Sequence, residues 1–280
     1  MKLPQFKNKA EEIEYIVANK EMLIATKKMS NKHTDAIHFI PTIDKTETSK
    51  AVLSGPVDPV LNNYEEPIEE PTRLKARLVL NTTRIMDSHY DVHIDGLWNK
   101  TLKEQRLLYL LQEHDMSFEG IISDNIKTSV ELLDWSSVGI KAAGQTQALI
   151  FDVEIPEERN EFMFEQYKNG YVKNHSVGMR YVKVELAVND ERYPEEFKIW
   201  NKYIDQVVNR KDAEAVGYFY PVLEAKLIEG SAVPMGSNYA TPVLSIEEKN
   251  IQPSDNDTEK NQPSNNDTEI KPNSLFINLL

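Results

Sequence analysis

The sequence contains no cysteine, which excludes disulfide bonds, thiolate metal sites and a cysteine nucleophile. No apolar run approaches the roughly 20 residues that a membrane-spanning helix needs. The first residues, MKLPQFKNKAEEIEYIVANKEMLIATKK, lack the apolar core of a signal peptide. We therefore expect a soluble protein of a reducing, cytosolic compartment, with no membrane as a partner.

Positive charge is also scarce. The chain has 32 Lys and Arg residues against 45 Asp and Glu residues, so its formal net charge is −13. A chain this acidic repels phosphate backbones, and we expect no direct nucleic-acid partner. Hydrophobic residues make up 40% of the 280 residues, which is enough for one sizeable domain with extensions or for two small domains.

The N-terminal part of the chain is expected to be a helical segment followed by a linker. Within residues 1–40, apolar side chains recur at helical spacing, as at Ile13, Ile16 and Val17. Residues 41–72 carry five prolines and the acidic run NYEEPIEEP, a composition typical of linkers.

Residues 73–245 are predicted to form one α+β domain that is mainly β. Strands are predicted from alternating or continuous apolar runs in TRLKARLVLNTTRI, RLLYLLQEHD, ALIFDVEI, YVKNHSVGMR and YFYPVLEAKLIEGSAV. The stretch PEERNEFMFEQYKNG starts with proline and acids and ends in glycine, as a capped helix does. The polar residues 190–215 are predicted to be a partly helical insertion.

Residues 246–280 are expected to be a disordered acidic tail. QPSDNDTEK and QPSNNDTEI repeat with a period of ten, and the segment has little apolar content. The stretch SLFINLL that follows is apolar again. A short apolar patch after a flexible spacer is typical of a docking motif, and a frayed end is the alternative.

The strand YVKNHSVGMR raises a chemical question. On a strand with period two, Ser176 shares a face with Asn174, Gly178 and Arg180. A serine beside a glycine makes a small, polar spot, which suits either a sheet edge or a nucleophile with open space beside it. A serine hydroxyl becomes nucleophilic when a base takes its proton, and that base must come from elsewhere in the chain.

His114 and Glu229 are the candidate partners of such a serine. His114 ends the apolar run LLYLLQEH, which fixes its backbone and leaves its ring partly open, as suits a general base. A structural histidine is the alternative. Counting by twos from Leu223 through Leu227 puts Glu229 on the apolar face, where its charge needs a partner. A bulge before Gly230 would instead turn Glu229 outward.

A second histidine pair lies in DSHYDVH, where His89 and His93 stand near Asp87 and Asp91. This spacing could hold a metal if the segment were a helix. The Asp-Gly pair that follows predicts a turn, so we interpret the segment as a solvated loop. We expect neither a metal nor another cofactor.

A serine, a histidine and a carboxylate are the parts of a hydrolytic triad, here in the chain order His, Ser, Glu and without a G-x-S-x-G elbow. In this order the chain resembles the prohead maturation proteases of tailed bacteriophages, a family related in fold to the herpesvirus assemblin proteases. Four stretches within residues 76–244 carry the resemblance: DSHYDVHIDGLWNKTL, LLQEHD, YKNGYVKNHSVGMR and IEGSAVPMGSNYATPVL.

The resemblance implies an assemblin-like β-barrel core with packed helices and a serine endopeptidase activity. It assigns His114 as general base, Ser176 as nucleophile and Glu229 as the third member, with Asp115 or Glu224 as fallbacks. The oxyanion donors stay open between Arg180 and backbone amides of the serine strand. The long insertion and the N-terminal extension depart from the family pattern.

The resemblance also implies a setting. The enzyme, phage or prophage encoded, would act in the host cytoplasm inside the assembling prohead, cutting scaffold, capsid protein and itself, with dimers as its form of self-association. We hypothesise that residues 1–72 are a propeptide or targeting segment and that residues 272–280 help recruit the protein to the capsid shell. The rival interpretation is a catalytically inactive scaffold or capsid-assembly protein of the same fold.

Overall fold

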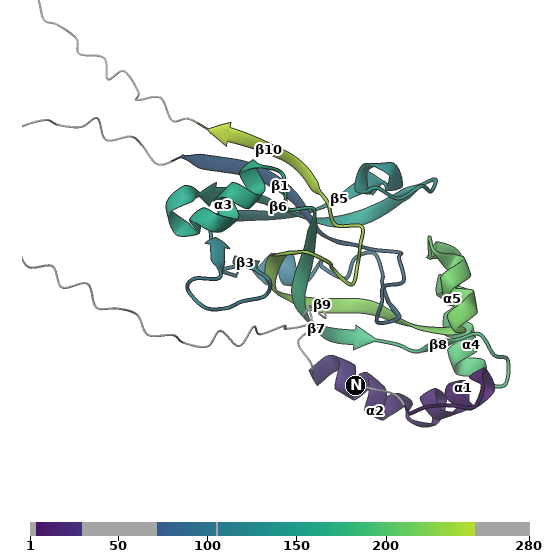
Figure 1. Ribbon diagram of the computed structural model, residues 1–280. Helices are drawn as coiled ribbons and strands as arrows, with labels where there is room; N and C mark the ends of the chain where they lie inside the picture. The colour runs from purple at the N-terminus through teal and green to yellow at the C-terminus, as the bar shows by residue number, and fades with distance from the viewer. Residues whose placement is uncertain (1–3, 30–71, 105, 250–280) are drawn as a thin grey trace, which may run out of the picture. The chain divides into compact units, whose positions relative to one another are not determined.

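The computed structural model describes residues 4–29, 72–104 and 106–249 (Figure 1). Its helices are α1 (Lys9–Ala18), α2 (Lys20–Met29), α3 (Glu161–Lys168), α4 (Pro194–Tyr203) and α5 (Arg210–Val216), with short 3-10 turns η1 (Thr101–Glu104), η2 (Trp135–Val138), η3 (Glu157–Arg159) and η4 (Ile204–Gln206). Its strands are β1 (Arg73–Thr82), β2 (Asp91–His93), β3 (Leu110–Gln112), β4 (Ile121–Ser123), β5 (Ile126–Asp134), β6 (Gln145–Pro156), β7 (Asn174–Val184), β8 (Ala187–Val188), β9 (Tyr218–Val233) and β10 (Val243–Lys249).

The predicted α+β class with a majority of strands is confirmed, and most predicted strands form. The exception is RLLYLLQEHD, where the strand covers Leu110–Gln112 alone. Leu107 is exposed, and β3 extends only over the three residues that pair with residues 230–232 of β9. The apolar run is therefore not one continuous buried strand. None of the described helices has the length and apolar content needed to cross a bilayer.

Two sheets form the domain. One has the order β10-β1-β6-β5, with every neighbouring pair antiparallel. The other is built on the long strand β9, which pairs antiparallel with β7 and parallel with the short strands β2 and β3. Because β7 and β3 both pair with β9 at residues 230–232, they occupy its two opposite edges, and β9 lies at the centre of its sheet.

The expected barrel does not close in the part of the chain that the structure describes. β10 and β5 are the edges of the first sheet, and neither pairs with a strand of the second. The two open sheets instead pack against each other through side chains. A Cβ at Gly230 of β9 would lie 2.6 Å from Phe151 and 2.8 Å from Leu80 of the other sheet, so glycine permits this close approach.

The predicted insertion at residues 190–215 is helical, as α4, η4 and α5. Trp200, Tyr203, Ile204 and Ala213 form a small apolar cluster with Phe219 of β9. The insertion is therefore packed on the second sheet through its own core.

The predicted N-terminal helix is confirmed, and both N-terminal helices join the core of the strands (Figure 1). Ile13, Ile16 and Leu23 are buried in the same cluster as the sheets. Lys20 Nζ of α2 lies 2.7 Å from Glu196 Oε1 of α4. The predicted linker lies almost wholly outside the described residues, as do residues 250–280 of the predicted tail. The expected start of the tail at residue 246 is wrong, because residues 246–249 belong to β10 and pair with β1.

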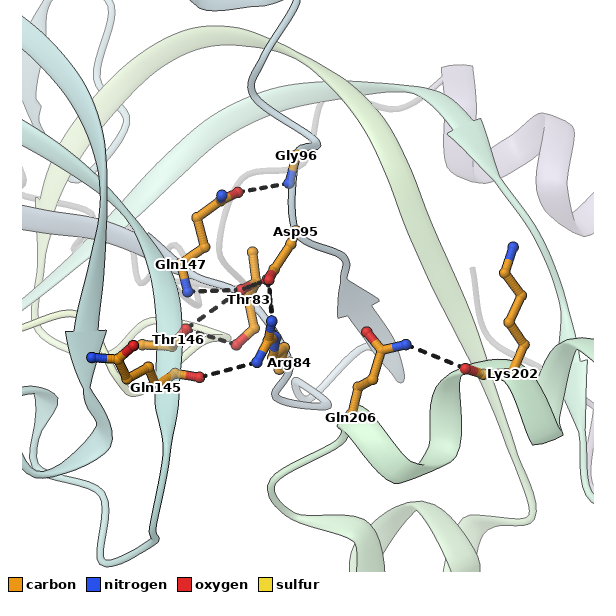
Figure 2. A network of polar contacts seen from close by, with 9 residues as sticks. All are labelled: Thr83, Arg84, Asp95, Gly96, Gln145, Thr146, Gln147, Lys202 and Gln206. Carbon is orange, nitrogen blue, oxygen red and sulfur yellow. Dashed lines mark hydrogen bonds and ion pairs between the residues drawn. The ribbon is translucent and has the colours of Figure 1, made fainter.

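The turn predicted after β2 is confirmed, and a polar network fixes it against the first sheet (Figure 2). Thr83 Oγ1 donates to Asp95 Oδ1 at 2.6 Å, and Arg84 pairs with the same carboxylate. The backbone N–H of Gly96 donates to Gln147 Oε1 at 2.6 Å. Gly96 has φ +87°, a left-handed conformation that favours glycine. The network ties the turn to β1 and β6.

Because Ile16 is fully buried at 0% exposure, we predict that Ile16→Ala destabilises the whole protein by about 2–5 kcal/mol. Chemical denaturation of the full chain measures this loss. Met29→Ala, at a side chain that is 84% exposed, is the matched control and should change stability by less than about 0.5 kcal/mol. Equal stability of the two variants would mean that α1 does not belong to the folding unit.

Candidate active site

A β-bulge in β9 decides where Glu229 points. Gly178 of β7 pairs with Glu229, but the next residue, Met179, pairs with Leu227, so Ile228 is the extra residue. Glu229 therefore lies on the opposite face from Leu227, and the bulge alternative is the one that the structure adopts. Glu229 is nevertheless 0% exposed. Its burial comes from groups that cover this face, not from the hydrophobic core.

His114 is the group that reaches the Glu229 carboxylate. Its Nδ1 lies 2.7 Å from Glu229 Oε1, and its side chain is nearly buried. The loop after β3 brings it there through two consecutive left-handed residues, Glu113 (φ 49°) and His114 (φ 62°). The N–H of Glu113 donates to the carbonyl of Ala232 at 2.9 Å, which holds this loop against β9.

Ser231 fixes both partners, and sequence reasoning did not assign it a role. Its hydroxyl donates to Glu229 Oε2 at 2.6 Å and accepts from the backbone N–H of His114 at 3.2 Å. Both carboxylate oxygens of Glu229 are thus hydrogen-bonded. A signal was present in the sequence, because Ser231 stands two residues after Glu229 and shares its strand face.

Gly178 provides the space that the carboxylate occupies. A Cβ at this position would lie 1.9 Å from Glu229 Oε1 and 2.7 Å from its carboxyl carbon. The backbone of Gly178 is not left-handed, so close approach of Glu229, not backbone strain, is what requires glycine here.

Ser176 lies two residues before Gly178 on β7 and pairs directly with Ser231. Directly paired residues of antiparallel strands project from the same face, so Ser176 is on the face that carries Glu229 and Ser231. The residue is buried. The structure thus joins His114 to Glu229 by a hydrogen bond and places Ser176 on the same side of the neighbouring strand.

The fallback acids are engaged elsewhere. The Asp115 carboxylate accepts from the backbone N–H and the hydroxyl of Ser117, both at 2.8 Å, and these bonds lower its pKa. Glu224 Oε1 lies 3.0 Å from Lys100 Nζ. Of the three acids considered, Glu229 is the one that the fold brings to His114.

His175, the neighbour of Ser176 in sequence, faces the other way. Its Nε2 lies 3.0 Å from the Tyr167 hydroxyl and its Nδ1 lies 3.1 Å from the carbonyl of Thr241. Burial lowers the pKa of His175 to about 4. The ring is therefore neutral at pH 7, with Nδ1–H donating to Thr241 and Nε2 accepting from Tyr167.

The segment DSHYDVH is not a solvated loop, because Asp87, Asp91 and His93 are buried. His93 Nδ1 lies 2.8 Å from Asn81 Nδ2, and His93 Nε2 lies 3.3 Å from the Tyr181 hydroxyl. Tyr181 donates to Asp91 at 2.8 Å. In the described ranges, no group of three or more His, Asp or Glu residues is arranged to hold a metal ion.

Lys27 of α2 completes this buried network. Its Nζ lies 2.5 Å from Asp91 Oδ1 and donates to the carbonyl of His89 at 3.1 Å. Nearby, Asp87 Oδ1 accepts the backbone N–H groups of His89 and Asp91. Burial raises the pKa of Asp87 to about 6, and the Asp91 carboxylate adds to the effect.

Comparison of the chain with family models, with curated proteins and with solved structures gives no match.

We predict that Gly178→Ala destabilises the protein by about 1–3 kcal/mol, because the new methyl group occupies the space of the Glu229 carboxylate. The double variant Gly178→Ala/Glu229→Ala removes the clash. The decrease in its free energy of unfolding, measured by chemical denaturation, should be smaller than the sum of the decreases in the two single variants. Additive losses would show that Gly178 does not accommodate this carboxylate.

The raised pKa of the Asp87 carboxyl predicts that the stability of the fold depends on pH. Its folded pKa of about 6 exceeds the unfolded value of 3.8, so the folded state binds more protons between these values. Its contribution to stability therefore falls as pH rises through this window. Asp87→Asn keeps a carbonyl oxygen for the two N–H donors. The free energy of unfolding of the variant minus that of wild type, measured by chemical denaturation, should rise by about 2–3 kcal/mol between pH 4 and pH 7. A constant difference across pH would contradict the assignment.

Proposed function

We propose that the protein is a serine endopeptidase in which Ser176 is the nucleophile, His114 the general base and Glu229 the acid that orients it. The observation that carries the proposal is the buried hydrogen bond between His114 Nδ1 and Glu229, with Ser176 on the same face of the adjacent strand. A buried carboxylate needs a partner, and a histidine whose second nitrogen can accept a proton is the partner that catalysis requires.

Each group has a defined step. With Nδ1–H donated to Glu229, the His114 ring keeps Nε2 as the proton acceptor. Ser176 Oγ attacks the carbonyl carbon of a peptide bond and its proton passes to Nε2. The C–N bond then breaks and the amine leaves with that proton, which gives an acyl-enzyme. Water attacks the ester by the same route and releases the acid and free Ser176.

The environment of Glu229 supports this role. The carboxylate is fully buried and has Ser231 on its second oxygen, so its position is fixed before any substrate arrives. A fixed negative charge beside Nδ1 stabilises the imidazolium that forms when Nε2 takes the proton. Ser231 is a positioning residue in this scheme, because its hydroxyl is already used by Glu229 and His114.

The biological setting follows from the resemblance alone. We place the enzyme among prohead maturation proteases with an assemblin-like fold, acting on scaffold and capsid protein inside an immature phage head. If the chain also cuts itself between residues 41 and 72, α1 and α2 would not leave at once. Their buried side chains and the Lys27–Asp91 pair would hold them on the domain without a covalent link.

A fluorophosphonate probe tests the nucleophile directly. We expect one covalent adduct on the purified full chain, mapped by mass spectrometry to Ser176 and absent from Ser176→Ala. Glu229→Gln keeps the shape of the side chain but loses its charge, and we predict labelling slower by about four orders of magnitude. Ser245→Ala, at an exposed position of β10, is the control and should label as wild type.

Co-expression with a phage major capsid protein encoded in the same genome tests the substrate. We expect wild type to cut the capsid protein or itself at defined bonds, as read by intact mass, and Ser176→Ala to leave every chain whole. If neither protein produces cuts and the probe labels no serine, the assembly-protein interpretation replaces the protease.

A further inference from the structure

Strand β5 lies at one edge of the first sheet (Figure 1). Within the described residues it pairs with β6 alone, and this pairing runs from Ile126 to Asp134 without a register shift. Its sequence, IKTSVELLD, has no proline or glycine and a single lysine. Proteins protect edge strands with prolines, bulges or several charges, because the free backbone groups can pair with another chain. β5 has few of these protections.

The opposite edge of the same sheet is better protected. β10 pairs with β1 through a register shift, and it carries the exposed acidic residues Glu247 and Glu248. A bulge and adjacent like charges both disfavour the addition of a strand. Of the two edges, β5 is therefore the one suited to accept a further strand.

The outward-facing backbone groups of β5 belong to its even-numbered residues. The N–H of Glu154 on β6 donates to the carbonyl of Asn125 at 3.1 Å, so the backbone of residue 125 faces β6. The backbone groups of successive residues in an antiparallel strand point to opposite edges. The N–H and C=O groups that point away from β6 are therefore those of Ile126, Thr128, Val130, Leu132 and Asp134.

The sequence of β5 is complementary to itself. Two copies can pair antiparallel across a two-fold axis if outward-facing residues of one copy meet outward-facing residues of the other. With the axis at Ser129, Ile126 lies opposite the partner's Leu132. Thr128 then lies opposite the partner's Val130. This register forms about eight backbone hydrogen bonds, and the facing side chains are apolar or β-branched.

The charges of β5 favour the same register. Lys127 lies opposite the partner's Glu131 on both sides of an axis at Ser129. Arg77 and Ser129 both bond to Glu131 Oε1, so Oε2 stays available to that lysine. An axis at Val130 would remove this ion pair, and an axis at Glu131 would set two carboxylates against each other.

A groove of about 660 Å³ lies where the partner strand would place its exposed leucine. Ile126 and Thr128 line it at the start of β5, together with Leu107 and Leu227. Leu132 is 59% exposed and Leu107 is 69% exposed. Directly opposite residues of antiparallel strands project from the same face, so the partner's Leu132 enters the groove beside Ile126. The pairing thus covers apolar side chains that are otherwise in water.

We propose that β5 is a self-association surface, at which two copies of the chain join their first sheets into one continuous sheet. β5 belongs to the sheet β10-β1-β6-β5, whereas Ser176 and Glu229 lie on strands of the other sheet. The proposal therefore does not depend on the proposed function, and it holds for an assembly protein as well as for a protease.

Sedimentation velocity of the full chain measures the association, with Ser176→Ala in every sample so that no chain is cleaved. We expect dimers at concentrations on the order of 10–100 μM, because a pair of edge strands is a small interface. A chain that is still monomeric at about 300 μM, or that forms assemblies without a dimer, would overturn the proposal.

A proline tests pairing through the backbone. Thr128→Pro removes an outward-facing N–H group and leaves the hydrogen bonds to β6 in place. We expect this variant to dimerise at least about tenfold more weakly than the parent chain. Thr128→Ala keeps the N–H group, and as the matched control it should change the dissociation constant by less than about threefold. Equal association of the parent chain and the folded proline variant would refute strand pairing.

A charge exchange tests the register and leaves the backbone unaltered. Lys127→Glu and Glu131→Lys should each weaken dimers about tenfold or more, because like charges then face each other. Mixing the two variants should restore association, since every carboxylate then faces an ammonium group. Lys141→Glu, at an exposed position outside β5, makes the same change of net charge and should associate as the parent chain does. Dimers that both variants leave unchanged, or that mixing does not restore, would contradict the register.

The groove is tested by Leu132→Ser, which should weaken dimers about tenfold or more. Met235→Ser is the matched control, because Met235 is 79% exposed and lies outside β5. Equal effects of the two substitutions would refute the docking of Leu132. None of these measurements reads activity, so their failure leaves the protease proposal intact, and failure of fluorophosphonate labelling leaves this proposal intact.

Discussion

The buried Glu229 carboxylate is the constraint around which the rest of the site is arranged. A charge taken fully out of water is costly unless hydrogen-bond donors surround it. His114 and Ser231 supply those donors, and Gly178 leaves room for the oxygen between strands. The left-handed loop that carries His114 follows from the same requirement, since it brings the ring back over β9.

The sequence was sufficient to predict the features that depend on local pattern. Alternation predicted β1, β6 and β9, and helical spacing predicted α1, because each burial pattern is written into a single segment. His114, Ser176 and Glu229 were chosen as candidates by residue type, by place in a strand and by resemblance. Their joint action stays a proposal, although the fold does bring His114 and Glu229 together.

The features that sequence could not supply depend on pairing between distant segments. The bulge at Ile228 is a shift in the pairing of β7 with β9, and the sequence of neither strand alone shows it. The role of Ser231 could not be predicted without knowing that the Glu229 side chain points away from the core. Lys27 and Asp91 are far apart in sequence, and their contact follows from how α2 packs, so DSHYDVH was wrongly interpreted as a loop in solvent.

The bulge has a consequence for how such a chain can change in evolution. Regular alternation of faces would put Glu229 on the side of Leu227, and the extra residue Ile228 is what separates them. Loss of Ile228 would make Leu227 and Glu229 neighbours in a strand without a bulge, so the carboxylate would stay on the face that meets His114. A slip in pairing that takes Ile228 into the ladder would instead return the carboxylate to the side of Leu227. The position of the acid is therefore tolerant of a deletion at this point and sensitive to a change of register.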